Sequence, residues 1–400
     1  MAQQTIGRAS LITPFAFLAI ATATNQMSFA SWQTLVNNFA KDFGATGFEI
    51  GVQQSIREIP GLLAFTAAFV LLLMREQTLA RASLFVLGLG IALTGFFPSV
   101  AGLYATTLIM SIGFHYYETV NQSLSLQWFD RKEAPTRLAR IMSLSAITQC
   151  AAYLFILVAA RVWNVSYQNF FLGFGLVSVV AALWLSFAYP MFPQHVPQNR
   201  GVVVRKRYWL YYALNFMGGA RRQIFVVFAA WLMVEKFGYK PEDVAALFLI
   251  NYLFNFFAAP VVGRFILRFG ERAAIVFENV SLMGVFVAYA FVQDARVAAA
   301  LYVIDNAFFA LSIAQKTYFQ KIADPADLAP TAGVAFTINH IAAVFLPAAL
   351  GLLWLSSPAA VFLCGAGFAA VALLLATFIP RDPDAERPTI FARSVEAPAE

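Results

Sequence analysis

The side chains of this sequence that could carry chemistry are few, and they lie inside long apolar runs. In the string GFHYYETVNQ, His115, Glu118 and Gln122 occupy positions i, i+3 and i+7, which fall on one face of a helix. A carboxyl group in an apolar environment can bind and release a proton, and a histidine one turn away can tune or relay that proton. This face therefore predicts a proton-coupling site, with Glu118 as the first candidate and Glu58 and Asp305 as the others.

Three arginines also lie within apolar runs, where an ionised side chain costs at least about 2.5 kcal/mol and needs a partner or water. Arg57 adjoins Glu58, whereas Arg221 and Arg222 follow the glycine pair of the string GGARRQ. A guanidinium group binds carboxylates and phosphates through two parallel hydrogen bonds, so the arginines predict a substrate with an anionic group. Because successive helical residues point about 100° apart, we expect one of Arg221 and Arg222 to bind substrate and the other to pair with an acid.

Neutral polar side chains in other apolar runs complete the set of site candidates. The predicted substrate-binding residues are Gln26, Arg57, His115, Arg221, Arg222, Asn306 and Asn339. A structural interpretation competes with this one, in which the three arginines form buried ion pairs that set the helix register, with Glu58, Glu118 and Asp305 as their partners. His115 and His340 would in that case be hydrogen-bonding groups between helices.

The elements that must position these residues follow from the composition. Apolar residues make up 60% of the 400 residues and charged residues only 12%, which excludes soluble, disordered and disulfide-stabilised classes and indicates a membrane protein. A helix needs about 20 apolar residues to cross the hydrocarbon layer. Twelve runs have approximately this length: 11–39, 48–74, 80–97, 100–129, 138–162, 167–189, 209–234, 244–266, 273–292, 297–319, 331–355 and 359–379.

The chain is therefore expected to be an all-helical membrane protein with two pseudo-symmetric halves of six helices each. We predict an N-terminal six-helix bundle, a cytoplasmic linker, a C-terminal six-helix bundle and a disordered cytoplasmic tail, over residues 1–190, 191–207, 208–380 and 381–400. The strings DRKEAPT and DPADLAPT begin at Asp130 and Asp324, 194 residues apart, and support an internal repeat.

Lys and Arg residues are distributed unequally between the two sides of such a protein. Of the 27, nineteen fall in the termini and even-numbered loops or at the run ends that border them, five in odd-numbered loops or at the run ends that border those, and three deep within apolar runs. Because cytoplasmic loops are enriched in Lys and Arg, both termini are predicted to be cytoplasmic. We expect a multi-pass protein of the inner (plasma) membrane.

The string GRFILRFGER follows the eighth apolar run. It is similar to the cytoplasmic loop Gly-x-x-x-Asp-Arg-x-Gly-Arg-Arg/Lys of the major facilitator superfamily, which the whole chain apart from the tail resembles. The matching residues, which the resemblance implies form a cytoplasmic gate, are Gly263, Arg268, Gly270 and Arg272. Leu267 replaces the usual Asp, and arginines in such a loop would also serve as headgroup anchors without a gating role.

The resemblance further implies alternating access between the two halves, with the first, fourth, seventh and tenth spans lining a central cavity. On this basis we expect a secondary active transporter of a small molecule that bears an anionic group, with protons as the candidate coupling ion. A multidrug or cation exporter that works as a proton antiporter is the main alternative. A non-transporting membrane scaffold or receptor with the same fold is the second alternative.

Signals of enzymatic and metal chemistry are missing from the sequence. It has no Walker loop, no GxGxxG at a strand-to-helix turn and no HExxH, and Cys150 and Cys364 have no metal-ligand spacing. We therefore predict no enzymatic activity, no cofactor and no metal. The expected partners are a small-molecule substrate, membrane lipids and protons, with no nucleic acid, and the protein is expected to be a monomer.

Overall fold

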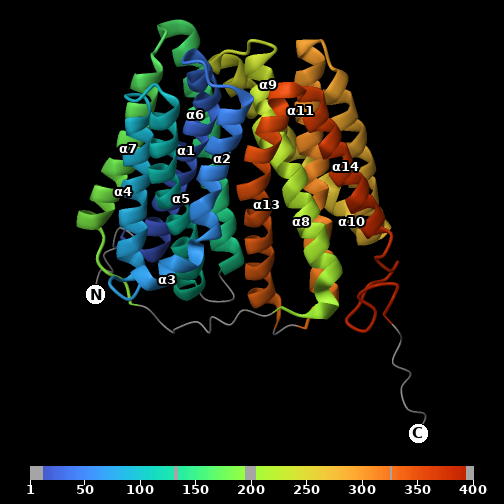
Figure 1. Cartoon of the computed structure of the whole chain (residues 1–400). Coiled ribbons are helices and arrows are strands. Elements are labelled where there is room, and N and C mark those ends of the chain that lie inside the picture. Colours follow the sequence, from blue (N-terminus) through green and yellow to red (C-terminus); the bar gives the residue numbers. More distant parts are fainter. Residues whose placement is uncertain (1–11, 130–133, 194–203, 325–326, 393–400) are drawn as a thin grey trace, which may run out of the picture. The chain divides into compact units, whose positions relative to one another are not determined.

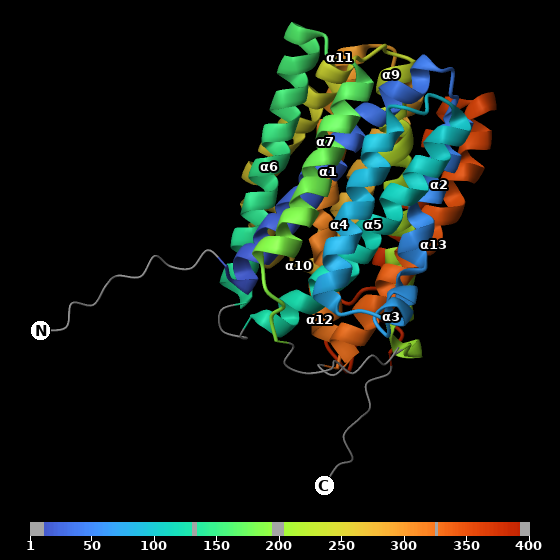
Figure 2. The same ribbon diagram turned by 90° about the vertical axis from the view of Figure 1, so that its left-hand side faces the viewer.

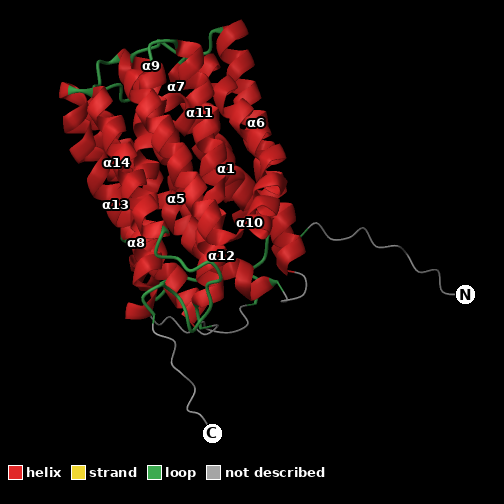
Figure 3. Ribbon diagram, turned by 90° about the vertical axis from the view of Figure 1, so that its right-hand side faces the viewer, coloured by secondary structure: helices red, strands yellow, loops and turns green. Residues whose placement is uncertain are grey.

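The computed structural model describes residues 12–129, 134–193, 204–324 and 327–392. Their regular elements are helices, and no strand occurs among these residues (Figure 3). Contacts divide the chain into two units, which are residues 1–36 with 63–198 (the first unit) and residues 37–62 with 199–400 (the second unit). Each unit has its own apolar core.

The first unit contains most of the helices of the predicted N-terminal half (Figure 2). They are α1 (Pro14–Asp42), α3 (Ala67–Val70), α4 (Glu76–Thr94), α5 (Val100–Trp128), α6 (Ala134–Trp163) and α7 (Tyr167–Ala188). Helix α1 belongs to this unit only as far as Val36. Helix α4 packs against α5 and α7. A Cβ atom on Gly90 would lie 2.3 Å from the backbone nitrogen of Met110, and one on Gly88 would lie 2.5 Å from the Gly175 oxygen. Glycine at these positions therefore allows α4 to approach both neighbours closely.

The second unit contains one helix of the N-terminal half and the helices of the C-terminal half. They are α2 (Gly47–Leu62), α8 (Trp209–Gln223), a π-helical segment (Ile224–Ala229), α9 (Ala230–Glu235), α10 (Pro241–Phe291), α11 (Ala295–Phe309), α12 (Ile313–Ile322), α13 (Leu328–Ser356) and α14 (Pro358–Ala376). Helix α10 bends at Gly270, whose φ of 80° and ψ of 166° leave the helical region. Glycine adopts this conformation without strain, and the bend separates the two arms of α10.

Helical segments of the structure account for all twelve predicted apolar runs. The second run is α2 with α3, the seventh is α8 to α9, the eighth and ninth are the arms of α10, and the tenth is α11 with α12. The predicted all-helical, twelve-span fold is therefore confirmed. Seven described stretches are by themselves long and apolar enough to cross a membrane: Glu76–Thr94, Arg140–Trp163, Tyr167–Ala188, Val261–Phe291, Ala295–Ile322, Thr337–Ser356 and Pro358–Ala376.

Helix α2 groups with the second unit because it packs against α13. A Cβ atom on Gly51 would lie 2.2 Å from the Pro347 oxygen, and one on Gly47 would lie 2.1 Å from the Trp354 side chain. Only residues without a side chain allow two helices to come this close. The domain boundaries at residues 190 and 208 stay a prediction, and most of the predicted linker between them lies outside the described residues.

The chain after α14 folds back onto the second unit, so the prediction of a disordered tail is wrong for residues 381–392. The Tyr318 hydroxyl donates a 2.6 Å hydrogen bond to the Pro388 carbonyl oxygen. The Ile390 amide donates a 3.0 Å hydrogen bond to the Phe378 carbonyl oxygen. These contacts anchor a segment whose overall polar composition does not indicate structure, and the rest of the tail lies outside the described residues.

Candidate functional site

The first unit contains a carboxyl group that is bound by neutral amides. Glu118 on α5 accepts two hydrogen bonds at Oε1 from α1, one from Asn25 Nδ2 and one from Gln26 Nε2, each 3.1 Å long. Asn25 is fully buried and Glu118 is half-buried. Among the described residues, no basic side chain forms an ion pair with Glu118. A proton can therefore neutralise this carboxyl group without leaving an opposite charge unpaired.

The other two residues of the predicted polar face of α5, His115 and Gln122, have different environments from Glu118. His115 is buried, and its Nδ1 lies 3.0 Å from the Ser111 hydroxyl on the preceding turn. Gln122 is exposed. The hydrogen bonds to Glu118 come from Asn25 and Gln26 on α1 and not from His115. The roles of His115 as substrate ligand or proton relay therefore stay predictions.

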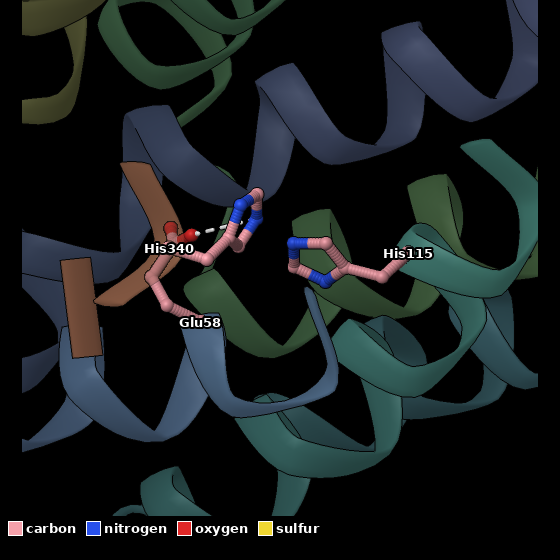
Figure 4. Close-up of side chains that lie close together, drawn as sticks. All are labelled: Glu58, His115 and His340. Carbon is pink, nitrogen blue, oxygen red and sulfur yellow. Dashed lines mark ion pairs between the residues drawn. The ribbon is translucent and has the colours of Figure 1, made fainter. Parts of the chain in front are cut away.

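A polar cluster of α2, α8 and α13 lies within the second unit, and we call it the Arg57 cluster. Its members, all buried, are Gln54, Arg57, Glu58, Gln223 and His340. Arg57 pairs with Glu58 and also donates a 3.0 Å hydrogen bond to Gln54. Gln54 Nε2 lies 3.1 Å from Glu58 Oε1 and 3.2 Å from Gln223 Oε1. His340 Nε2 lies 3.5 Å from Glu58 Oε2 (Figure 4), so a guanidinium and an imidazole both contact this carboxylate.

Arg222 adds a second positive charge to this region of the second unit. Its side chain is exposed, and its charge acts electrostatically on Arg57. With His340 neutral, the Arg57 cluster and Arg222 together carry two positive charges and the one negative charge of Glu58. This excess of positive charge suits an anionic group.

A second buried cluster, which we call the Arg221 cluster, joins α8, α10 and α11. Arg221 donates hydrogen bonds of 2.6 Å to Glu278 and 2.7 Å to Asn279. Asp305 is 2% exposed and interacts electrostatically with both Arg221 and Glu278. Glu278 Oε2 and Asp305 Oδ2 have no protein hydrogen-bond partner among the described residues. One guanidinium and two carboxylates leave one excess negative charge, which is costly to bury.

The two adjacent arginines of α8 therefore have different environments. Arg221 is buried and paired with an acid, whereas Arg222 is exposed. The acid is Glu278, to which the sequence pattern assigned no role. The π-helical segment Ile224–Ala229 follows directly, and such segments occur frequently at functional sites. No motif in the sequence marks this segment.

Two asparagines predicted to bind substrate contact neighbouring helices. Asn306 accepts a 2.8 Å hydrogen bond from Asn255 and so connects α11 with α10. Asn339 donates a 3.2 Å hydrogen bond to the Ala335 oxygen of its own helix. A Cβ atom on Gly219 would lie 2.5 Å from Asn339 Oδ1, so this glycine makes room for the amide group. The substrate-binding roles of both asparagines stay predictions.

The predicted gate residues lie on α10 on both sides of its bend: Gly263 and Arg268 precede Gly270, and Arg272 follows it. Arg268 is exposed, and Leu267, which replaces the usual acid, is 88% exposed. The ion pair at this bend is made instead by Glu271, which lies 2.9 Å from Lys321 on α12. A gating role stays a prediction for Gly263, Arg268, Gly270 and Arg272.

An ion pair near the start of α13 was not predicted from the sequence. Arg205 donates two hydrogen bonds to Asp327, one of them 2.9 Å long, and the Tyr208 hydroxyl donates a third of 2.8 Å. The hydrogen bond from Arg205, together with its charge, holds the pKa of the Asp327 carboxyl below its usual range. Asp327 belongs to the repeated string DPADLAPT, which is the signal that could have drawn attention to it.

Buried charges on helices long enough to cross a membrane define a multi-pass membrane protein with polar sites inside the bundle. The family model described as Major Facilitator Superfamily matches residues 15–347, and the chain belongs to this family. It is therefore a transporter and not an enzyme. No curated protein sequence matches the chain.

Solved structures of transporters have the same fold. A crystal structure of a mutant of the nucleoside transporter NupG has a TM-score of 0.75 and 14% identity, and the match covers 91% of this chain and 99% of that chain. A bacterial homolog of the human lysosomal transporter Spinster, inward-facing and unoccupied, has a TM-score of 0.68 and 12% identity, with 91% and 94% covered. At these identities the similarity establishes the fold alone.

Proposed function

We propose that the protein is a secondary active transporter that moves a small molecule with an anionic group by alternating access. The observation that carries the proposal is the charge of the second unit around Arg57, where the described Arg57 cluster and the exposed Arg222 contribute two guanidinium groups and the one carboxylate of Glu58. An exposed guanidinium can form two parallel hydrogen bonds with a carboxylate or phosphate oxygen pair. Arg222 is therefore the primary substrate ligand in this proposal, and Arg57 supplies supporting positive charge.

The proposal includes proton coupling through Glu118. This carboxyl group is half-buried, and the hydrogen bonds that it accepts from described residues come from the neutral amides of Asn25 and Gln26. A chain without a nucleotide-binding motif must use an ion gradient or transport downhill, and a carboxyl group within the membrane is a simple proton carrier. The proposal also includes a monomeric protein of the inner membrane with both termini in the cytoplasm. The unequal distribution of Lys and Arg supports the cytoplasmic position of the termini.

A multidrug or cation exporter is the second candidate function. The observation that favours it is the excess negative charge of the Arg221 cluster, where Glu278 and Asp305 outnumber one guanidinium. In that case the acids would bind the cation and the arginines would be structural. A non-transporting scaffold would bind ligand without moving it across a membrane.

The test begins with ligand-induced stabilisation of the purified protein, because a ligand that binds the folded state raises the unfolding temperature. The probes are succinate, glucose 6-phosphate, uridine and tetraphenylphosphonium, which represent a carboxylate, a phosphate, a neutral nucleoside and a lipophilic cation. Counterflow of the stabilising compound in proteoliposomes then measures transport. Stabilisation by an anion supports the proposal, stabilisation by the cation alone supports the exporter, and binding without counterflow supports the scaffold.

Two variants of Arg222 test whether this side chain binds the anionic group of the substrate. We expect Arg222→Gln to abolish counterflow of an anion and Arg222→Lys to lower it at least about tenfold, because an ammonium group cannot form the bidentate contact. The matched control is Arg264→Gln, which removes an exposed arginine of α10. Equal transport by wild type and both Arg222 variants would contradict the assignment.

A further inference from the structure

The bend of α10 borders a pocket that contains none of the residues proposed to bind substrate or carry the coupling proton. Its volume is about 1110 Å³, and it is lined by residues around the bend at Gly270, at the end of α12 and in the segment that follows α14. In Figure 1 this last segment is the red loop that follows α14. Ligand-binding pockets for small molecules commonly measure about 300–1,000 Å³, so this one can hold a large group. All of its lining residues belong to the second unit.

Positive charge predominates in this pocket. Four basic and two acidic side chains line it, which are Arg268, Arg272, Lys321 and Arg381 against Glu271 and Asp382. The pair between Lys321 and Glu271 removes one charge of each sign. Among the described residues, neither Arg268 nor Arg272 forms an ion pair with an acid. The pocket therefore keeps a net charge of +2, provided by groups that are free to bind an anion.

Exposed apolar side chains adjoin these arginines. Leu267 is 88% exposed and Phe269 is 53% exposed, and both line the same pocket. The Phe269 ring packs at 4.8 Å between centroids against Phe265, which fixes it in this position. In a membrane protein, a basic pocket beside exposed apolar side chains is typical of the depth where phosphate headgroups meet hydrocarbon.

We propose that this pocket binds the phosphate group of an anionic phospholipid. Arg268 and Arg272 bind the phosphate oxygens, and the upper part of an acyl chain lies along Leu267 and Phe269. A soluble phosphate compound would use the same charges but would gain nothing from the apolar side chains. The combination of both features therefore favours a lipid over a free phosphate.

The experiment uses the full-length protein purified in detergent with phosphatidylcholine. Phosphatidylglycerol is titrated while the unfolding temperature is measured, and the number of bound lipids is followed by native mass spectrometry. Additional phosphatidylcholine and glycerol 3-phosphate are titrated in parallel. We expect stabilisation and specific binding with phosphatidylglycerol alone.

Variants of the lining arginines test whether phosphatidylglycerol binds in this pocket. Arg268→Gln and Arg272→Gln should each weaken phosphatidylglycerol binding about fivefold, because one basic residue near a charged headgroup contributes about that factor. Arg272→Lys should retain most of the binding, since a point charge still attracts phosphate. The matched control is Lys316→Gln, which removes an exposed lysine of α12 that does not line the pocket. The unfolding temperature without lipid checks that each variant is folded.

Three results would overturn the proposal. Equal effects of phosphatidylglycerol and phosphatidylcholine would show that charge is not recognised. Equal stabilisation by glycerol 3-phosphate would identify a site for soluble phosphates. A loss in Lys316→Gln as large as in Arg268→Gln and Arg272→Gln would show that binding follows overall charge and not this pocket.

Discussion

The buried acids of the two units have different partners. Glu118 in the first unit is bound by the neutral amides of Asn25 and Gln26, whereas Glu278 in the second unit is bound by Arg221. Protonation of Glu118 leaves no charge unpaired, but protonation of Glu278 would remove the counter-charge of a guanidinium that is 2% exposed. The comparison therefore favours exchange of a proton at Glu118 and a fixed, structural charge at Glu278.

The substitution with the largest expected effect on function is Glu118→Gln. It keeps the shape of the side chain and an oxygen that can accept from the amides, but it removes the proton site. We expect substrate exchange across proteoliposomes to remain and accumulation driven by a pH gradient to be lost. The measurement compares counterflow with uptake under an imposed gradient.

Asp305→Asn is measured in parallel, because it removes the alternative coupling acid of the Arg221 cluster in the second unit. Undiminished accumulation in Glu118→Gln would assign coupling to Asp305 or Glu58 and would show that the neutral partners of Glu118 do not make it the proton carrier. If all three acids could be replaced without loss of accumulation, the protein would be a facilitator or would use another ion. Loss of exchange together with accumulation would indicate a substrate-binding or structural role for Glu118.

The next largest effect is expected on stability, from Arg221→Gln. Removal of one partner leaves the Glu278 carboxylate buried and without its guanidinium, which costs about 3–5 kcal/mol. Thermal unfolding in detergent should show a clear loss for Arg221→Gln and little change for Arg222→Gln, whose arginine is exposed. Combining Arg221→Gln with Glu278→Gln should restore part of the stability. If the Arg221→Gln protein is as stable as wild type, Glu278 does not depend on Arg221 to remain buried, and its charge is not a fixed structural one.

The sequence predicted the helices better than it predicted the contacts between them. Long apolar runs require helices in a membrane, so the twelve segments could be predicted, whereas the sequence indicated a loop between the eighth and ninth runs and the structure has a bend at Gly270. The pairing of Arg221 with Glu278 joins residues 57 positions apart. It depends on how α8 and α10 are rotated about their axes relative to each other, which the sequence of each helix taken alone does not determine.

The candidate site shows the same limit at the level of single residues. The sequence indicated that Arg221 and Arg222 differ in direction, but only the structure shows which of them is buried. The association of Glu118 with Asn25 and Gln26 required the packing of α1 against α5. The anchored segment after α14 was missed because the hydrogen bonds that hold it connect its backbone to Tyr318 and Phe378, and its own polar composition does not indicate these contacts.

A smaller effect is expected at the glycine pair of α8, where it tests whether Gly219 makes room for the Asn339 amide in the second unit. A Cβ atom on Gly219 would lie 2.5 Å from Asn339 Oδ1, whereas one on Gly218 would lie 3.7 Å from Gln315. Gly219→Ala should displace the Asn339 amide and cost about 1–3 kcal/mol through overpacking. Gly218→Ala should be neutral or stabilise by up to about 1 kcal/mol through helix propensity. The unfolding temperature and the KM of transport are measured for both variants. If neither quantity differs between Gly218→Ala and Gly219→Ala, the Asn339 amide can move at little cost.

The smallest effect is expected at Asp327, whose partner Arg205 has a side chain that is 53% exposed. Because the hydrogen bond from Arg205 lowers the pKa of Asp327, the pair stabilises the folded protein above the unfolded pKa of about 3.9. That stabilisation decreases as the pH falls through this value towards the lower pKa of the folded state. Asp327→Asn should therefore unfold at a lower temperature than wild type at pH 7, and the difference should shrink below about pH 4. Glu386→Gln, which removes an exposed acid, is the control. A difference that does not depend on pH would show that Asp327 acts through neutral hydrogen bonds alone, unlike the charged pair of Arg221 and Glu278.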